Sequence, residues 1–490
     1  MSRETIRYIR AEGQKVHQTL DREFYLNFAG LKSKTDITEI LKPYQDLLEP
    51  EIFLSLRETR VHNEEDKNGI NLLLSFLAKI ILLSKTSQLK DSILDIEASS
   101  IFSIDKTKIP FRSSKAALLT KSKKQEIQEI ENKRGAILSK LNQLYLRQYA
   151  YKQKDSDDLG FSSYLHMYEV IEGLNTSALV EKAKEFIRDT EYISRDLLKW
   201  FFLKRMDIKL QNANLTDMFY LINSFELGSL PKMDPLSMAK ALLAETGLNP
   251  QAKIKFDREK RKGHVAGSIC YTSNPGVEIL ISTNLQGGIW DYESFLGSFG
   301  RGLSYGFTER DDYFEYKYLR EKSFLRIFSE LFKNLIFEPA WIKKHLRQDV
   351  ANDFLQFLYL RRLMLTRILS AKLIYEIGFY QGQDNKAETY KEIMEIATHS
   401  KASKHDYLFD IEPHLSSADS FKASIIEPQL RAYLIENFDE QWWRVKEAGE
   451  FLVEIWRTGG RTSIKNISEN YGFGGTDITK LSQTFEEVLG

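Results

Sequence analysis

Apolar side chains recur at intervals of three and four residues along most of this chain, and this spacing limits its fold more than any other feature. Such a period places the apolar residues on one side of an α-helix, whereas a half-buried strand alternates apolar and polar residues. Proline would interrupt helices of this kind, yet the 490 residues include only 10 prolines. The sequence therefore predicts a folded, mainly α-helical protein.

Two polar, turn-rich segments interrupt the helical pattern, near residues 155–160 and 247–264. We expect the second to separate two lobes, an N-terminal helical lobe of residues 1–250 and a second lobe of residues 251–490. Two short β-branched runs follow it, and the turn sequence SNPG joins them. They predict one β-hairpin, over His264–Thr272 and Gly276–Thr283. A hairpin of this size must lie against helices and present an edge, which either receives an extended peptide or only packs.

Two further segments are predicted to be helical. The segment Ala116–Lys154 has Lys and Glu neighbours at helical spacing, and its basic cluster (Lys121, Lys123 and Lys124) is expected to be a solvated face. The apolar run Ile70–Leu83, which Ser75 and Lys79 interrupt, is too short to span a bilayer and predicts a buried helix. Near the C-terminus, Thr476 or Asp477 is expected to cap the last helix.

Charge and cysteine content exclude several classes of function. Lys plus Arg and Asp plus Glu both number 69, so there is no net field to hold a nucleic acid. The charged N-terminus does not resemble a signal peptide. Cys270 is the single cysteine, so no internal disulfide is possible. We expect a cytoplasmic protein without nucleic-acid or membrane partners.

The segment that follows the hairpin predicts a helix from Asp291, as N-cap, to about Tyr305. Gly297 and Arg301 are four residues apart, which places them side by side on one face. In a zinc peptidase, the same geometry serves an H-E-x-x-H helix, whose two histidines bind the metal while the glutamate accepts a proton from water. Here those five positions read G-S-F-G-R.

The surrounding sequence is similar to the oligoendopeptidase F and thimet oligopeptidase group of zinc peptidases. Family helices resemble HEFGHALHY, and SFLGSFGRGLSYGF keeps Phe299, Gly300, Leu303 and Tyr305. Downstream, FLRIFSELFKNLIFEPAWI and LSSADSFKASIIEPQLRAYL resemble two further family motifs, and the tail WWRVKEAGEFLVEIWRTGGR with YGFGGTDITKL completes the likeness. The resemblance covers most of the chain. It implies a two-lobed helical zincin fold with a small sheet beside the former active-site helix and a central cleft.

The resemblance also implies which positions have lost their chemistry. The first zinc ligand falls on Gly297, the general base on Ser298 and the second ligand on Arg301. A third ligand, a glutamate in the family, falls on Arg326. Two family tyrosines that are expected to stabilise the substrate or the oxyanion are replaced by Ser416 and Ser420.

No other residues of the sequence form a recognisable set of zinc ligands in place of the lost ones. Zinc takes about four ligands from His, Cys, Asp or Glu. The eight histidines include no pair four residues apart, and we interpret His399 and His405 as parts of a surface loop. Ser298 and Cys270 have no visible catalytic partners. We therefore predict that the zinc site is lost and that no cofactor is held.

The sequence leaves two interpretations of the arginines. With Tyr305 beside them, Arg301 and Arg326 place cations where a metal once sat, so they can hold a carboxylate or a phosphate. Alternatively, Glu293 and Glu330 neutralise them, which is the more common outcome for a buried arginine.

The favoured function is a catalytically inactive peptidase homologue that binds a peptide or protein segment, or acts as a scaffold, in a bacterial cell. An enzyme with a relocated or divergent active site in the same cleft is the alternative, and a structural subunit with a closed cleft is a third possibility.

Overall fold

The computed structural model describes residues 3–61, 63–104, 106–118, 124–224, 232–347, 352–475 and 477–490. Lys121, Lys123 and Thr476 lie outside these residues, as does the side chain of Lys124.

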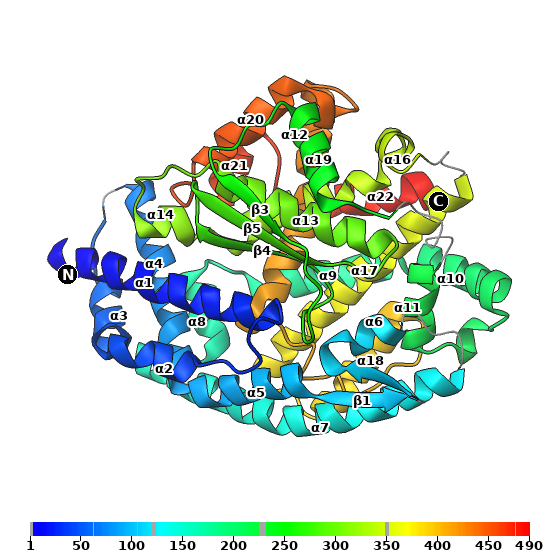
Figure 1. Cartoon of the computed structure of the whole chain (residues 1–490), viewed down its shortest axis with the longest axis horizontal. Helices are drawn as coiled ribbons and strands as arrows, with labels where there is room; N and C mark the ends of the chain where they lie inside the picture. Colours follow the sequence, from blue (N-terminus) through cyan, green and yellow to red (C-terminus); the bar gives the residue numbers. More distant parts are fainter. Residues whose placement is uncertain are drawn as a thin grey trace.

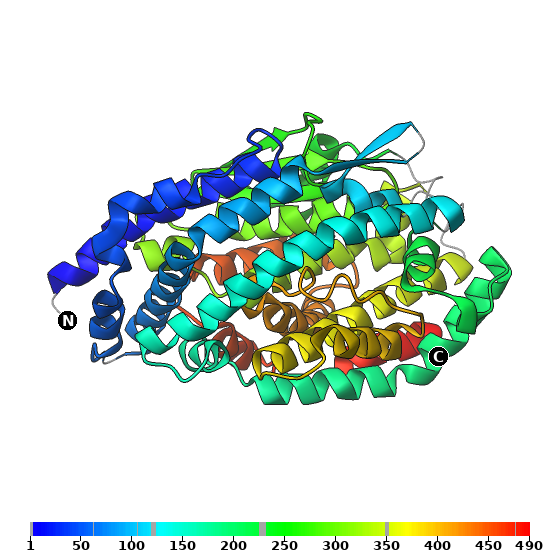
Figure 2. The ribbon, with the colours of Figure 1, turned by 90° about the horizontal axis from the view of Figure 1, so that it is seen from below.

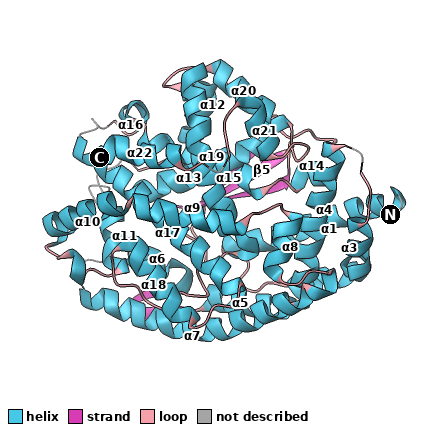
Figure 3. Ribbon diagram, turned by 180° about the vertical axis from the view of Figure 1, so that it is seen from behind, coloured by secondary structure: helices cyan, strands magenta, loops and turns pink. Residues whose placement is uncertain are grey.

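Helices make up most of the fold, as the apolar spacing predicted (Figure 1, Figure 3). The first half of the chain has α1 (Arg3–Phe28), α2 (Ile37–Leu41), α3 (Pro50–Arg57), α4 (Glu64–Lys85), α5 (Ser87–Ser99), α6 (Ser114–Leu118), α7 (Lys124–Asp155), α8 (Tyr164–Ile171), α9 (Thr176–Asp189), α10 (Glu191–Met206), α11 (Leu215–Ser224) and α12 (Pro235–Thr246). The second half has α13 (Ile289–Gly306), α14 (Phe314–Tyr318), α15 (Lys322–Lys333), α16 (Pro339–His345), α17 (Asn352–Tyr380), α18 (Lys386–Thr398), α19 (Ser416–Asn437), α20 (Lys446–Arg457), α21 (Ile464–Tyr471) and α22 (Thr479–Leu489).

The apolar run that was predicted to be a buried helix forms α4, and most of its residues from Leu73 to Leu82 are buried. The helix has 22 residues and is therefore longer than the apolar run itself. Among the described helices, it is the one that is long and apolar enough to cross a membrane, by length and composition only. Half of its most apolar window is buried inside the protein, which is typical of a core helix. Its polar interruptions have a structural role, because Ser75 and Lys79 both donate hydrogen bonds to Glu172, the residue that follows α8, over 2.7 and 2.6 Å.

The predicted long helix is confirmed from Lys124 onward as α7, while residues 114–118 form the separate short helix α6. Figure 2 shows α7 crossing the molecule beside α5, which it contacts. Asp291 is not the N-cap that the sequence suggested. Gly288 occupies that position, and the Asp291 carboxylate accepts hydrogen bonds from the main-chain N–H groups of Gln286 and Gly287 at 2.9 and 2.7 Å.

The predicted hairpin is confirmed as β4 (Gly267–Asn274) and β5 (Glu278–Asn284), which pair in antiparallel fashion. The expectation of a single hairpin was wrong in two ways. β3 (Lys253–Asp257) adds a parallel strand to β5, giving the order β3-β5-β4. A second small hairpin joins β1 (Ile101–Ile104) to β2 (Thr107–Pro110).

Helices cover both faces of the three-stranded sheet. On one face, Tyr25 of α1 stacks on Tyr271 of β4, with ring centroids 4.9 Å apart. On the other face, Gly302 of α13 lies against Ile279 and Cys270. The sheet is thus held between the first helix of the chain and the helix that carries the family-like motif.

Figure 1 shows the first helices of the chain along the lower side of the molecule, and α12, α19 and α20 at the top. α17 runs between these parts and contacts α8, α9 and α10 as well as α19 and α22. A division at residue 250 therefore places a shared central helix in the second lobe, and the two lobes remain a proposal.

Candidate functional site

The motif helix α13 is wedged between the sheet and α15, and its glycines permit this close approach. A Cβ atom on Gly300 would lie 2.5 Å from the main-chain oxygen of Phe328 on α15. On the opposite side of the helix, a Cβ on Gly302 would lie 3.2 Å from Ile279 of β5. A larger residue at position 300 cannot be accommodated without moving backbone. The framework positions of the motif are therefore retained for packing.

Ser298, at the position of the family's general base, makes a structural hydrogen bond. Its hydroxyl donates to the main-chain carbonyl of Ser268 on β4 over 2.8 Å. One turn earlier on α13, the Ser294 hydroxyl accepts from the N–H of the same residue over 2.6 Å. β4 is an edge strand, so these two serines satisfy both main-chain groups of Ser268. A peptide cannot add as a strand at this residue without displacing them.

Gly297 and Arg326 lie on adjacent helices, as the resemblance implied for two metal ligands. Ser329 of α15 donates a 2.9 Å hydrogen bond to the carbonyl of Gly297. Arg326 is three residues before Ser329, so it lies on nearly the same face of α15. Gly297 has no side chain to offer, and Arg326 carries a cation in place of a carboxylate.

Arg301 is exposed although the next seven residues of the chain are all buried. Within the described residues, its guanidinium has no carboxylate within ion-pair distance, and the Tyr305 hydroxyl, one turn later on α13, is its hydrogen-bond partner. The expectation that Glu293 neutralises it was wrong. Glu293 forms a buried ion pair with Arg361 of α17 instead. At the position of the second ligand, Arg301 is thus a cation without an acidic ion-pair partner among the described residues.

Tyr305, one turn after Arg301, is buried. Burial raises the pKa of its hydroxyl, so it is neutral near pH 7. The guanidinium of Arg320 lies 5.3 Å from the centre of the Tyr305 ring. This residue packs the interior and does not project into open space.

Arg326 does have an acidic partner, but not the predicted one. Its guanidinium lies 3.4 Å from a carboxylate oxygen of Glu412, and the two side chains are 39% and 36% exposed. Glu330, the expected partner, pairs with Lys333 at 3.0 Å. An ion pair with this much solvent contact contributes about 0–1 kcal/mol and can be exchanged for a ligand.

Ser416 and Ser420 stabilise the start of α19. The Ser416 hydroxyl donates to the carbonyl of Pro413 over 2.6 Å, and the Ser420 hydroxyl donates to that of Ser416 over 2.9 Å. Ser416 also accepts a 3.2 Å hydrogen bond from the ammonium of Lys322 on α15. Since α15 packs against both α13 and α19, the three helices bring all the degenerate positions to one region.

The residues of this region do not fit zinc. Glycine has no donor, arginine is a cation and the Ser298 hydroxyl is committed to Ser268. Throughout the described ranges, no three His, Cys, Asp or Glu side chains gather at metal-binding distance. Cys270 is also unsuited as a nucleophile, because burial raises the pKa of its thiol to about 12.

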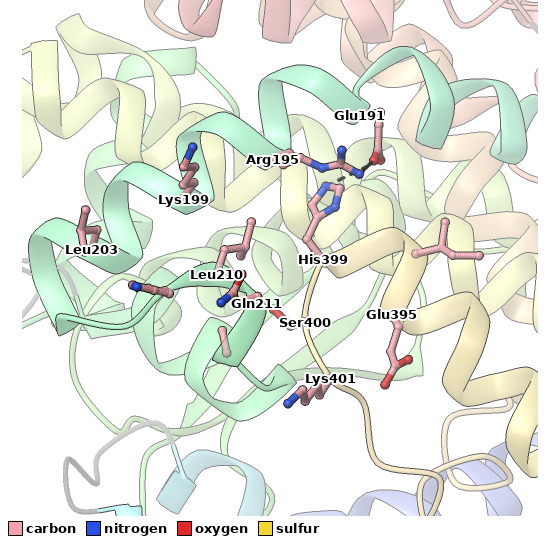
Figure 4. Close-up of a pocket in the computed structure, with 13 residues that line it drawn as sticks. Glu191, Arg195, Lys199, Leu203, Leu210, Gln211, Glu395, His399, Ser400 and Lys401 are labelled. Carbon is pink, nitrogen blue, oxygen red and sulfur yellow. Dashed lines mark hydrogen bonds and ion pairs between the residues drawn. The ribbon is translucent and has the colours of Figure 1, made fainter.

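A separate pocket of about 840 Å³ lies between α10 and α18, away from the motif helix (Figure 4). His399 lines it, although the sequence suggested a surface loop for this residue. Its Nε2 lies 2.9 Å from the Ser194 hydroxyl, and its side chain is only 6% exposed. Desolvation and the nearby Arg367 lower the pKa of His399 to about 4, so it is neutral. His405, in contrast, is exposed as expected.

No protein-family model matches the sequence, and no curated protein matches it. Solved structures do. PZ peptidase A in complex with an inhibitor is 13% identical, with 92% of this chain and 84% of that chain covered and a TM-score of 0.71. A Bacillus anthracis str. Ames protein assigned as an oligoendopeptidase F is 15% identical over 95% of this chain and 84% of that chain, with a TM-score of 0.65.

Another structure assigned as an oligoendopeptidase F is 13% identical over 96% of this chain and 86% of that chain, with a TM-score of 0.67. These likenesses show the fold, which is that of a metallopeptidase family. The predicted fold class, mainly helical and zincin-like, is confirmed.

Proposed function

We propose that this chain is a catalytically inactive metallopeptidase homologue that binds a peptide or protein segment. One observation carries the proposal most directly. The residue at the general-base position, Ser298, donates a hydrogen bond to the Ser268 carbonyl and so fixes a strand to a helix. A hydroxyl in this state does not take a proton from water.

The neighbouring positions support the loss of hydrolysis. Family chemistry requires a metal that polarises a carbonyl and activates water. Gly297 and Arg301 supply no ligand for one, and Arg326 carries positive charge. A relocated serine or cysteine mechanism has no support from Ser298 or Cys270, for the reasons given above.

The binding role is supported by Arg301, which is an exposed cation without an acidic partner among the described residues. Because Ser294 and Ser298 occupy the edge of β4 at Ser268, we propose that a ligand is held by charged side chains and not by strand addition at that residue. We place this function in the bacterial cytoplasm, without a nucleic-acid or membrane partner.

The test combines metal analysis with peptide assays. Protein purified without chelator is expected to contain much less than one zinc per chain, and to leave a quenched fluorescent peptide library intact with or without added zinc. Stoichiometric zinc together with turnover would overturn the proposal in favour of a divergent enzyme.

Binding is measured separately, by fluorescence anisotropy of the same library. Arg301→Glu is expected to lower the fraction of the peptide library that is bound. Arg7→Glu, an equal charge reversal at an exposed position of α1, is the matched control and should have no effect. Equal binding by both variants and the parent would remove Arg301 from the site.

A further inference from the structure

Four lysines from four different helices gather around His414, just before α19. They are Lys79 of α4, Lys90 of α5, Lys152 of α7 and Lys322 of α15, and we call them the lysine cluster. All four lower the pKa of the His414 imidazole by their positive charge, in addition to desolvation. Electrostatic coupling of this kind requires proximity.

Two tyrosines of α8 lie between His414 and two of the lysines. The Tyr168 hydroxyl lies 2.6 Å from Nδ1 of His414, and the Lys79 ammonium lies 5.8 Å from the Tyr168 ring. Tyr164 lies beside Tyr168, with ring centroids 5.1 Å apart, and the Lys152 ammonium is 5.8 Å from the Tyr164 ring. On the other side, Lys322 reaches Ser416, two residues after His414.

Only one lysine of the cluster forms an ion pair with a described residue. Lys79 has a carboxylate partner, Glu172, at 2.6 Å. The Lys322 ammonium donates a hydrogen bond to a serine hydroxyl, and the ammonium groups of Lys90 and Lys152 make no hydrogen bond or ion pair with any described residue. Lys152 is only 8% exposed, and a buried ammonium without a partner is costly.

Nearby acids compensate this charge only in part, although Glu97 attracts Lys90, and Glu172 and Asp419 attract Lys322. Glu376 accepts a hydrogen bond from Ser417, and desolvation raises its pKa to about 8, so it is mostly protonated near pH 7. Asp419 is buried, and one of its carboxylate oxygens has no hydrogen-bond partner. Desolvation and the charge of Glu172 raise the pKa of Asp419 to about 6.

None of the four lysines of the cluster is fully exposed. Lys79, Lys90 and Lys322 keep partial contact with solvent. Nevertheless, desolvation and neighbouring lysines lower the pKa of Lys322 to about 8, and that of Lys152 to about 7. Three of the four lysines are therefore accessible to solvent in part, although the cluster is strongly desolvated.

The lysine cluster and the emptied peptidase site share one face of α15. Ser329 contacts Gly297, Arg326 lies one turn before it, and Lys322 lies one turn before Arg326. A ligand that reaches the former metal position can therefore extend one of its ends to the lysine cluster.

We propose that the lysine cluster binds a ligand carrying two or more carboxylate or phosphate groups, with those groups among Lys90, Lys152 and Lys322. This inference rests on the proposed binding function and specifies the chemistry of its ligand. The anion supplies the missing counter-charge, and each charge-assisted hydrogen bond forms away from bulk water, where it is strong. Acidic peptides and small phosphorylated compounds share this chemistry.

The experiment uses the full chain and three probes in isothermal titration calorimetry: hexaglutamate, a neutral Gly-Ser hexapeptide and pyrophosphate. Lys152→Met and Lys322→Met each remove one cluster charge. Lys154→Met removes an equal charge at an exposed position of α7, two residues from Lys152, and is the matched control. Lys152→Met deletes an uncompensated buried charge, so we expect it to fold at least as well as the parent.

We expect hexaglutamate or pyrophosphate to bind, with affinity that falls as salt is added and falls by roughly tenfold or more in either cluster variant. Lys154→Met should match the parent. Binding of pyrophosphate alone would keep the anion site and assign it to phosphorylated compounds, while contradicting the peptide-binding function.

Equal binding of the neutral peptide and hexaglutamate, unaffected by the cluster variants, would overturn the anion site and leave the peptide-binding function intact. Failure of both anions to bind the parent would overturn the anion site as well.

Discussion

The Ser298 hydroxyl of α13 and the main-chain carbonyl of Ser268 on β4 are joined by a 2.8 Å hydrogen bond, while Ser294 accepts from the N–H of the same residue. The two serines of α13 therefore bond the two main-chain groups of the same residue: Ser294 bonds the N–H of Ser268 and Ser298 bonds its C=O. Replacing each in turn separates their effects.

Ser294→Ala and Ser298→Ala are each expected to lower the free energy of unfolding by about 1 kcal/mol, because a partly buried main-chain group loses its partner. Urea denaturation measures this change. Hydrogen exchange distinguishes the two variants: the amide of Ser268 should exchange faster in Ser294→Ala and at the parental rate in Ser298→Ala. Equal acceleration in both would contradict the assigned roles.

Gly300→Ala is expected to destabilise the protein by about 3 kcal/mol or more, since the new Cβ would lie 2.5 Å from the Phe328 carbonyl oxygen. Thermal unfolding measures the loss. Gly135→Ala is the control on helix α7. Its Cβ would come no closer than 3.3 Å to the imidazole of His405, and alanine favours the helix, so it should be neutral or slightly stabilising. Similar stability of both variants would show that α13 and α15 can separate.

Arg301→Met is expected to change the free energy of unfolding by less than about 0.5 kcal/mol, because the guanidinium is exposed and has no carboxylate partner among the described residues. Arg361→Met should cost about 3–5 kcal/mol, because it leaves the buried carboxylate of Glu293 unpaired. Chemical denaturation of both variants gives the comparison. A large loss for Arg301→Met would mean that Arg301 stabilises the fold.

The stability of Lys152→Met relative to the parent should depend on pH. The folded pKa of Lys152 is about 7, below its ordinary value of 10.5. Below pH 7 both states carry the proton, and the parent bears the whole cost of a buried charge, on the order of 3–5 kcal/mol. Between pH 7 and 10.5 the unfolded chain binds more protons than the folded chain, so the parent gains stability as pH rises.

The advantage of Lys152→Met should therefore be greatest below pH 7 and shrink toward pH 10.5. Urea denaturation at several pH values, with Lys154→Met as control, measures it. An advantage that is constant with pH would mean that Lys152 is not desolvated as described.

Local patterns in the sequence predicted those parts of the fold that depend on local interactions. The turn SNPG between two β-branched runs was sufficient for β4 and β5. β3 was missed, because the segment Lys253–Asp257 alternates lysine with apolar residues beside a turn and acquires its strand partner, β5, only through a parallel pairing over a longer sequence distance.

The site was predictable to a similar extent. The family-like motif placed Gly297, Ser298 and Arg301 on one helix, but which acids neutralise which arginines depends on tertiary contacts with α17 and with Glu412. The lysine cluster has no sequence signature, since its members are contributed by four helices between residues 79 and 322. A lysine within the apolar run of α4, Lys79, was the single local signal, and Glu172 accounts for it.

The capped edge of β4 also bears on self-association. An uncovered edge strand offers its N–H and C=O groups to any extended chain, including the same strand of a second copy. At Ser268 both groups are already bonded within the protein, so two molecules cannot begin to pair there. Replacing Ser294 and Ser298 would therefore favour aggregation through β-sheet pairing in concentrated solution.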